Sequence, residues 1–299
     1  MERKTENGSS FYVDPLSDMF VLYLFGAPES NDILLDFINA VLNDAGFDPV
    51  VSVEVMNPFN LRTFVNDKLS ILDVKAKDQN GRIFDIEVQS VVDEVFINRS
   101  LYYWARNYAA QMTDGEMYSE LKPVICINLL KHKLFDSVEK LHTVFLAFEK
   151  DHKELPLTDH FQVHYIELEK FFQRDSTGKT HRALLQDWLE FFKKEGQEDD
   201  AMKTLVSENE IIKKAHDRYK SFTRSDELRE VYEAREKYKR DEATRLHLAE
   251  KRGIEQGIDK GKQEGKQEDA RRMLEEQLPV DLIQRVTGLS EEEIEGLRD

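Results

Sequence analysis

Acidic and amide side chains alternate with apolar ones in the segment at residues 83–89. Asp85, Glu87 and Gln89 fall at every second position, with one apolar residue between each pair. In an extended strand, this alternation places the polar side chains together on one face of a sheet. Carboxylates on one face repel each other unless a cation bridges them or one holds a proton. The segment is therefore a candidate metal site, although a solvent-facing polar strand would show the same pattern.

A partner strand is expected directly before this segment, at residues 69–76, because the intervening residues include an Asn-Gly pair that is typical of hairpin turns. We expect a three-residue loop at residues 79–81, in which Gly81 takes the left-handed conformation that such loops require. This register places Asp73 opposite Glu87, with Cβ atoms roughly 4.5–5.5 Å apart. A two-residue turn would instead send the two carboxylates to opposite faces of the sheet.

A pair formed by Asp73 and Glu87 would offer oxygen ligands, which suit Mg²⁺ or Mn²⁺. Mg²⁺ held by one or two carboxylates keeps several of its waters. Such an ion can activate one water and neutralise a phosphate at the same time. The chemistry that the pair predicts is therefore hydrolysis of a phosphodiester.

The elements that must position these residues alternate in type along the first half of the chain. Helices are expected at residues 18–24, 32–42 and 97–112, and strands at residues 50–56, 69–76, 82–89, 124–130, 142–148 and 162–168. The run at residues 124–130 is apolar throughout, which is typical of a strand buried on both faces. This order predicts an α/β domain with a mixed sheet flanked by helices.

The second half of the chain is rich in charged residues, Ala and Leu at helical spacing. Helices are expected at residues 181–194, 201–220 and 225–278, followed by a small terminal pair at residues 280–286 and 290–297. Gly288 is expected to end the first helix of the pair, and Ser290 with Glu293 to form a capping box. We therefore divide the chain into an α/β domain at residues 1–175 and a helical C-terminal region at residues 176–299.

Four glycines recur at intervals of four within the long charged segment, at residues 253–265. They are Gly253, Gly257, Gly261 and Gly265. Glycines at this spacing share one helix face and permit close approach of another helix, but each costs roughly 1 kcal/mol relative to Ala. A self-association helix, a solvated connector and a partner-binding segment all remain open for this stretch.

The composition excludes several classes of protein. The 42 Lys and Arg residues against 59 Asp and Glu residues give a net charge of −17, which argues against non-specific coating of nucleic acid but allows one local contact. One cysteine excludes a disulfide framework and a multi-cysteine zinc site. With a polar start, no apolar run of membrane-spanning length and no Gly-rich phosphate loop, we expect a cytoplasmic protein without a membrane segment or a nucleotide cofactor.

The segment SILDVKAKDQNGRIFDIEVQ resembles the core of the PD-(D/E)xK nuclease superfamily, in the branch called the Rpn (recombination-promoting nuclease/putative transposase) family. Outside that core, the resemblance extends to DPLSDMFVLYLFGAPESNDILLDFINAVL, RSLYYWARNYAAQMTDGEMYSELKPVICINLL, HTVFLAFEKDHKELPLTDHFQVHYIELEKF and TGLSEEEIEGL. It covers nearly the whole chain and is most specific in the middle segment.

The resemblance implies a restriction-endonuclease-like sheet and a Mg²⁺- or Mn²⁺-dependent DNA endonuclease linked to recombination or mobile-element DNA processing. It implies that Asp73 and Glu87 bind the metal with the carbonyl of Val88, and that Gln89 positions the attacking water. Gln89 stands where the wider superfamily has lysine. The exchange removes a positive charge that would stabilise the transition state, which affects the expected rate more than the fold.

Five further side chains are candidates for supporting this reaction or contacting DNA. They are Asp18, Lys75, Arg99, Tyr103 and Gln111. Four have a structural alternative: a helix N-cap for Asp18, an ion pair with the opposing Asp85 for Lys75, and packing or surface pairing for Arg99 and Tyr103. Gln111 is expected on the same helix as Arg99 and Tyr103.

Two other functions remain open. The first is a non-catalytic interaction or oligomerisation protein on a nuclease scaffold, and the second is a nuclease that acts on RNA. The widely spaced acids of a strand-transfer enzyme are not evident, so transposition itself is not expected. We expect DNA as the partner and a homodimer formed through the C-terminal helices.

Overall fold

The computed structural model describes residues 11–59, 73–89, 95–113, 115, 117–172, 184–197 and 199–298. Two compact units follow each other along the chain, Met1–Tyr232 and Glu233–Asp299. The candidate site belongs to the first unit.

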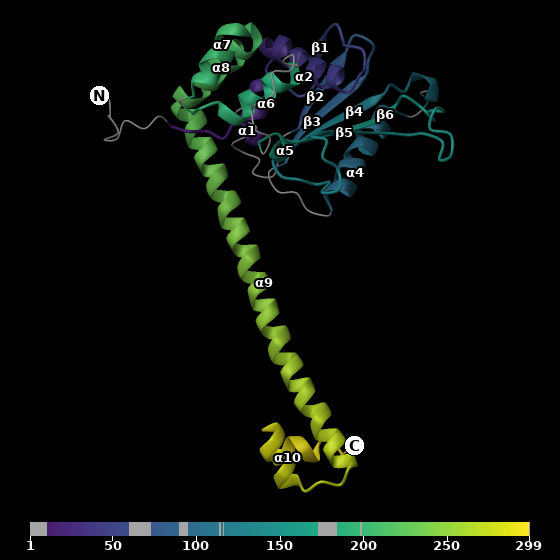
Figure 1. Ribbon diagram of the computed structural model, residues 1–299, viewed down its shortest axis with the longest axis vertical. Coiled ribbons are helices and arrows are strands. Elements are labelled where there is room, and N and C mark those ends of the chain that lie inside the picture. Colours follow the sequence, from purple (N-terminus) through teal and green to yellow (C-terminus); the bar gives the residue numbers. More distant parts are fainter. Residues whose placement is uncertain are drawn as a thin grey trace, which may run out of the picture. The chain divides into compact units, whose positions relative to one another are not determined.

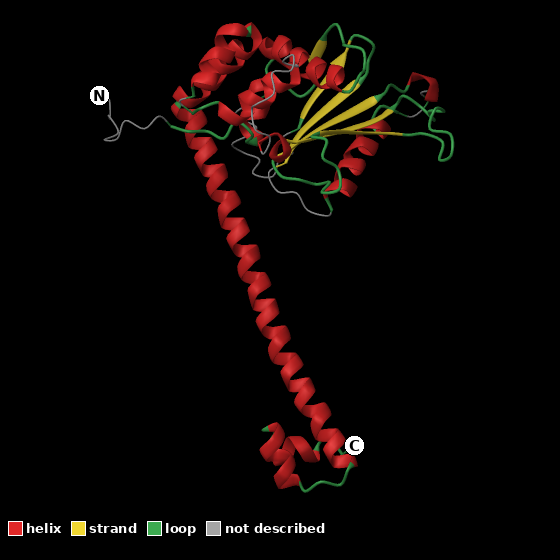
Figure 2. Cartoon of the chain, in the orientation of Figure 1, coloured by secondary structure: helices red, strands yellow, loops and turns green. Residues whose placement is uncertain are grey.

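Six strands in the described part of the first unit form one mixed sheet (Figure 2). They are β1 (Val53–Val55), β2 (Val74–Asp78), β3 (Ile83–Gln89), β4 (Val124–Leu130), β5 (His142–Leu146) and β6 (Phe161–Glu167). Their spatial order is β1-β2-β3-β4-β6-β5, in which β3, β4 and β6 are parallel and the other neighbours antiparallel. The predicted mixed sheet is confirmed, and the bounds of β4 agree with the prediction because every residue of this strand is buried.

Helices of the same unit lie on both faces of the sheet (Figure 1). They are α1 (Asp18–Phe25), α2 (Asn31–Asp44), α4 (Phe96–Ala109), α5 (Leu168–Phe172), α6 (Leu184–Lys194), α7 (Asp200–Glu208) and α8 (Glu210–Arg224), with short 3-10 turns η1 (Pro28–Ser30) and η2 (Tyr118–Glu120). One hydrophobic cluster joins α1, α2, α6, α7 and α8 to one face, and a second joins α4 to the other face.

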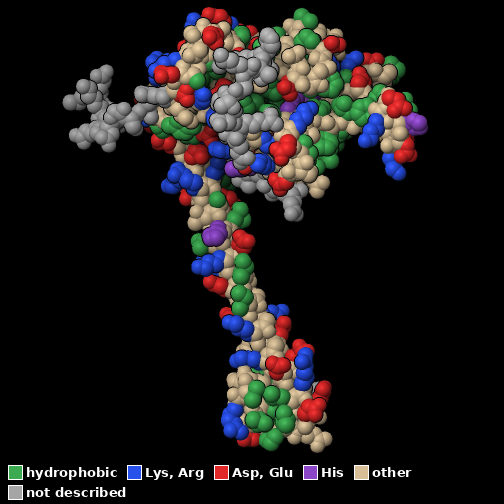
Figure 3. Space-filling model, viewed as in Figure 1, with side chains coloured by type: hydrophobic (Ala, Val, Ile, Leu, Met, Phe, Trp, Pro, Cys, Tyr) green, Lys and Arg blue, Asp and Glu red, His purple; other side chains and the backbone are tan. Residues whose placement is uncertain are grey.

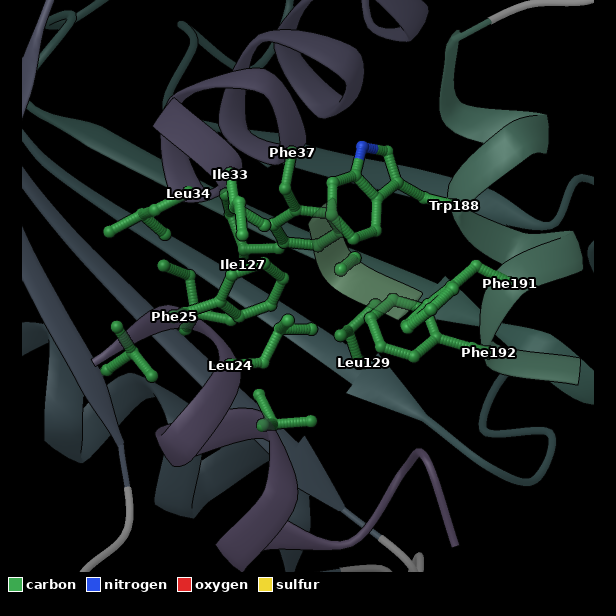
Figure 4. Packing of buried hydrophobic residues seen from close by; sticks show 14 of the residues in the cluster. Leu24, Phe25, Ile33, Leu34, Phe37, Ile127, Leu129, Trp188, Phe191 and Phe192 are labelled. Carbon is green, nitrogen blue, oxygen red and sulfur yellow. The ribbon is translucent and has the colours of Figure 1, made fainter. Parts of the chain in front are cut away.

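The larger cluster is built around aromatic side chains from three helices (Figure 4). The ring of Trp188 on α6 lies 5.6 Å from that of Phe25 on α1 and 5.5 Å from that of Phe37 on α2. Ile127 and Leu129 of β4 pack in the same cluster as these rings. Helices from the segment assigned by sequence to residues 176–299 thus belong to the core of the first unit, which continues beyond residue 175.

The smaller cluster leaves one face of β2 and β3 open to polar side chains. Phe96 and Trp104 of α4 pack with Cys126, Val163 and Tyr165 over the neighbouring strands. Buried polar residues lie on the same side, among them Asp85 of β3 and Asn107 of α4. The site therefore lies between β2, β3 and α4, where the apolar packing of α4 ends.

Several elements differ in length from the prediction. The strand expected at residues 50–56 is reduced to β1, and residues 69–72 of the first hairpin strand lie outside the described residues. The helix expected at residues 201–220 is two helices, because Asn209 is extended (φ −125°, ψ 108°). Its side chain accepts hydrogen bonds from the backbone N–H groups of Ile211 and Ile212, and this cap starts α8.

The helix α9 (Asp226–Glu275) continues into the second unit, where α10 (Val280–Thr287) and α11 (Glu291–Glu295) follow it. Charged side chains of both signs are interspersed along α9 (Figure 3). A small apolar cluster holds the last helices together, Gly288 is left-handed at φ 70°, and the predicted capping box at Ser290 is present. No helix in the described ranges has both the length and the apolar character that a bilayer crossing requires.

Candidate active site

The hairpin formed by β2 and β3 has the register that the sequence predicts. Val74 pairs with Ile86 and Lys75 with Asp85, so one further step places Asp73 opposite Glu87. The turn is the expected three-residue loop, in which Gly81 has φ 85°.

The carboxylate of Asp78 fixes the loop of this hairpin. It accepts hydrogen bonds from the backbone N–H groups of Asn80 and Arg82 and from the Arg82 Nε at 2.6 Å. A local hydrogen-bond network thus fixes the loop length, and the loop length sets the register of the two carboxylates.

Three carboxylates share this side of the hairpin. Asp73 is 6% exposed and Asp85 is 4% exposed, whereas Glu87 is partly exposed. Burial, followed by the charges of Asp85 and Glu87, raises the pKa of Asp73 to about 8, against the opposing charges of Lys75 and Arg99. Without a cation beside it, the charged form of Asp73 is disfavoured near neutral pH.

The same environment acts on the other two acids. Burial raises the pKa of Glu87 to about 7, while the Arg99 charge lowers it and the Asp85 charge raises it. Burial also raises the pKa of Asp85, although Lys75 and a hydrogen bond from Asn107 act in the opposite direction. Close negative charges of this kind are what a divalent cation would stabilise.

An asparagine of α4 lies between Lys75 and Asp85. The Lys75 Nζ donates to the Asn107 Oδ1 at 2.7 Å, and the Asn107 Nδ2 donates to the Asp85 Oδ2 at 2.5 Å. The direct ion pair that the sequence offered as an alternative is therefore replaced by a chain of two hydrogen bonds. Asn107 was not among the predicted residues, although it follows Arg99 and Tyr103 at intervals of four and thus shares their helix face.

A second asparagine holds the backbone around Asp73. The Asn57 Nδ2 donates to the carbonyl of Asp73, and the Asn57 Oδ1 accepts from the backbone N–H of Lys75, both at 2.7 Å. In the sequence, Asn57 is only the residue that follows the strand expected at residues 50–56. Its side chain in fact substitutes for a strand partner at the position where Asp73 enters the sheet.

Two of the predicted residues on α4 lie near the acids. The Arg99 Nε is 3.9 Å from the Glu87 Oε1, and its guanidinium lies over the ring of Phe96 at 5.0 Å. Within the described residues, the Arg99 Nε and Nη2 are buried without a hydrogen-bond partner. Burial and the charges of Glu87 and Asp73 raise the pKa of Tyr103, which places its phenol within electrostatic reach of the site.

Gln111 lies beyond the end of α4, which stops at Ala109 and not at residue 112 as expected. Its amide exchanges two hydrogen bonds with the backbone of Lys122, at 2.9 and 3.0 Å. These bonds tie the end of α4 to the segment that leads into β4. The amide is thereby engaged away from the carboxylates, and the structure does not bring Gln111 to the site.

Asp18 is the first residue of α1, whose N-cap is Ser17. The alternative in which Asp18 is the N-cap is therefore wrong, although its carboxylate accepts from the backbone N–H of Met19 at 2.8 Å. The apolar residues of α1 pack in the larger cluster, against the sheet face opposite to α4. The helix that begins with Asp18 thus lies on the sheet face opposite to α4, which carries Arg99 and Tyr103.

Gln89 is the last residue of β3, two positions after Glu87. Strand alternation places its side chain on the face of Glu87 and that of Val88 on the other face, where Val88 packs against the larger cluster. For Val88, the predicted role therefore concerns the backbone carbonyl alone.

The donor set fits a hard divalent cation. Asp73 and Glu87 are oxygen ligands, and their raised pKa values reflect burial and negative charge that a cation would offset. No group of three or more His, Cys, Asp or Glu side chains in the described ranges is arranged to hold a metal. An ion here would be bound by two carboxylates and completed by backbone and water oxygens, which is typical of Mg²⁺.

Comparison with known proteins identifies two regions of this chain. A family model described as "PD-(D/E)XK nuclease family transposase" matches residues 15–249. A second one, described as "Rpn/YhgA-like nuclease family, C-terminal HTH domain", matches residues 263–299. Neither the curated proteins nor the solved structures gave a match.

Proposed function

The chain belongs to the PD-(D/E)XK nuclease family transposase family, in its Rpn branch, and from this membership we propose that it is a metal-dependent DNA endonuclease. The observation that supports the proposal most is the hairpin register, in which Asp73 stands opposite Glu87 next to a helix that carries Arg99. We place the reaction in recombination or mobile-element DNA processing, consistent with the description of the family.

Asp73 and Glu87, with the Val88 carbonyl, would hold Mg²⁺ or Mn²⁺. When bound, such an ion supplies a water of lowered pKa and neutralises charge on the phosphate. The Gln89 amide can accept a hydrogen bond from the attacking water and orient it, but it carries no charge and cannot take over the electrostatic role of a lysine.

Two residues of α4 are suited to bind the DNA backbone. The Arg99 side chain is 34% exposed beside Glu87, and guanidinium groups bind phosphate oxygens in a bidentate manner. The Tyr103 hydroxyl could donate to a neighbouring phosphate oxygen. We infer that α4 orients the substrate backbone over the carboxylate pair.

The homodimer through the C-terminal helices and the cytoplasmic setting remain parts of this proposal. The sole cysteine, Cys126, is buried in β4, which agrees with a protein that does not depend on disulfides.

The test is nicking of a supercoiled plasmid by the full chain in Mg²⁺. We expect cleavage by the wild type and a loss of at least about a hundredfold in Asp73→Asn and Glu87→Gln, because each removes a charged ligand. Asp151→Asn is the matched control, since it makes the same chemical change at an exposed position.

Equal nicking by the wild type and Asp73→Asn would reject the assigned site. Cleavage of an RNA substrate without cleavage of DNA would favour the RNA nuclease. Absence of both activities, together with absence of metal binding by calorimetry, would favour the non-catalytic interaction protein.

A further inference from the structure

We propose that Lys75 supplies the positive charge at the scissile phosphate that Gln89 cannot supply, and that Asn107 is the positioning residue that holds Lys75 in place. The inference rests on the proposed nuclease function and adds two residues to its site. Neither the family match nor the charge of the chain assigns these roles.

The position of Lys75 follows from the hairpin. Asp73 directly precedes β2, in which Lys75 is the second residue, so extended backbone across this step places both side chains on one face of the sheet. Its partner across the hairpin is Asp85, which is two residues before Glu87. The ammonium group therefore belongs to the row of side chains directly next to the carboxylate pair.

A lysine without a fixed side-chain position would place its positive charge at the phosphate only part of the time. Its four-carbon side chain has many rotamers, and ordering it costs up to about 2 kcal/mol of conformational entropy. Here the Nζ is held at 2.7 Å by the Oδ1 of Asn107, which is 8% exposed. The ordering is thus built into the folded protein before a substrate binds, which is the condition for effective electrostatic catalysis.

The chemistry of the three groups determines how the Asn107 amide is oriented. An ammonium group only donates and an ionised carboxylate only accepts, so the amide oxygen must face Lys75 and the amide nitrogen must face Asp85. Asp85 is 4% exposed and holds the amide at 2.5 Å. A neutral asparagine is well suited here, because the residue has to accept from one neighbour and donate to the other.

Lys75 retains hydrogen-bonding capacity in this arrangement. An ammonium group has three N–H donors, and within the described residues Asn107 is its one side-chain partner. The two remaining donors are available to oxygens of a phosphate. Arg99 occupies a different position, next to Glu87 and over the ring of Phe96, and so complements Lys75 without replacing it.

The experiment measures single-turnover plasmid nicking in Mg²⁺ at saturating DNA, together with DNA affinity, using the full chain. We expect Lys75→Met to lower the cleavage rate about a hundredfold, as does removal of one preorganised electrostatic donor in other enzymes. Asn107→Ala should lower the rate roughly tenfold with unchanged DNA affinity, because Lys75 remains but loses its fixed position. The double variant should be no slower than Lys75→Met, since Asn107 acts through Lys75.

A charge swap separates positioning from a general structural role. Asn107→Asp alone places two carboxylates together and should be as slow as Asn107→Ala. The double variant Asn107→Asp with Asp85→Asn keeps the net charge and can form both hydrogen bonds. Lys75 still donates to residue 107, whereas the bond between residues 85 and 107 is reversed, so that residue 85 donates. We expect its cleavage rate to return to within about threefold of the wild type, given that close residues couple energetically.

Three outcomes would overturn the inference. The first is wild-type cleavage by Lys75→Met, and the second is a double variant of Lys75 and Asn107 whose losses multiply. The third is a charge-swap variant that folds with the wild-type melting temperature but stays as slow as Asn107→Asp, which would assign Asp85 a direct role. A wild type that cleaves no DNA would reject this inference together with the proposed function, whereas these three outcomes leave that function intact.

Discussion

At the scale of single residues, the site is a place where burial and like charge act against ionisation. Asp73, Asp85 and Glu87 each have a raised pKa, and burial is the largest cause in all three cases. Buried carboxylates are rarely retained for stability, because desolvation disfavours their charged form. The metal site proposed above would account for their presence on one hairpin face.

These shifts predict how the stability of the metal-free protein depends on pH. A carboxyl group whose pKa is higher in the folded state binds its proton more tightly there, so it stabilises the fold at low pH. For Asp73, with an ordinary value of 3.8 and a folded value of about 8, this contribution is lost as the pH rises through that interval. In EDTA, the wild type should therefore melt lower at pH 8 than at pH 5.

Thermal melts of the wild type and Asp73→Asn check this expectation. The variant should melt at least about 2 °C above the wild type at pH 8, and the difference should shrink towards pH 5. Added Mg²⁺ should raise the melting temperature of the wild type but not that of the variant. Identical pH profiles for the two proteins would refute the electrostatic account of the site.

At the scale of elements, α6 extends the core of the first unit beyond residue 175. Trp188 packs against Phe25 and Phe37, and its Nε1 donates to the Asp36 Oδ1 at 2.8 Å. Trp188 and Asp36 are 152 residues apart in the sequence, so a helix from much later in the chain completes the core over α1 and α2. We therefore expect the first unit to depend on this helix for its stability.

Trp188→Ala should accordingly lower the free energy of unfolding by about 3–5 kcal/mol, as removal of a fully buried aromatic side chain does elsewhere. Urea unfolding followed by circular dichroism measures the change. Leu184→Ala on the same helix is the control, since Leu184 is 44% exposed and should change stability by less than about 0.5 kcal/mol. Equal stability of the two variants would show that α6 is dispensable for the core.

The elements also show how far sequence reasoning extends. The bounds of β4 and the register of the hairpin could be predicted, because a continuous apolar run and an Asn-Gly loop are local signals. Asn57 and Asn107 could not be identified in this way, since each acquires its role from a partner on another element. Helical periodicity identifies the apolar faces of α6 to α8, but it does not show which surface these faces cover. For this reason the domain boundary predicted from sequence lies at residue 175, before these helices.

At the scale of the whole chain, the charge distribution indicates where DNA should bind. Residues 263–299, which match an HTH domain, carry 11 acidic and 5 basic side chains. Four glutamates occupy the five-residue α11, which makes this helix unfavourable for contacts with phosphate. We therefore expect the principal DNA contacts on α4 of the first unit.

We place the contact of the proposed dimer in the glycine-spaced part of α9. A Cβ atom built on Gly257 would meet no neighbouring heavy atom within 4 Å in one copy of the chain, so substitution there should not disturb the monomer. Gly257→Leu should block close approach of a second helix and shift the protein from a dimer to its 35.0 kDa monomer.

Sedimentation velocity compares the wild type with Gly257→Leu and with Glu255→Leu. Glu255→Leu places a Leu side chain about 200° around the helix from position 257, and this variant should remain dimeric. A wild type that sediments as a monomer at all concentrations would contradict the proposed dimer, and would favour a solvated connector or a partner-binding segment for these glycines.

Anomalous scattering from crystals of the full chain soaked in Mn²⁺ shows whether Asp73 and Glu87 bind one ion. One anomalous peak is expected between their two carboxylates, and it should be lost in crystals of Glu87→Gln. Wild-type crystals with no peak at this position, or with these two side chains directed away from each other, would contradict the proposed metal site.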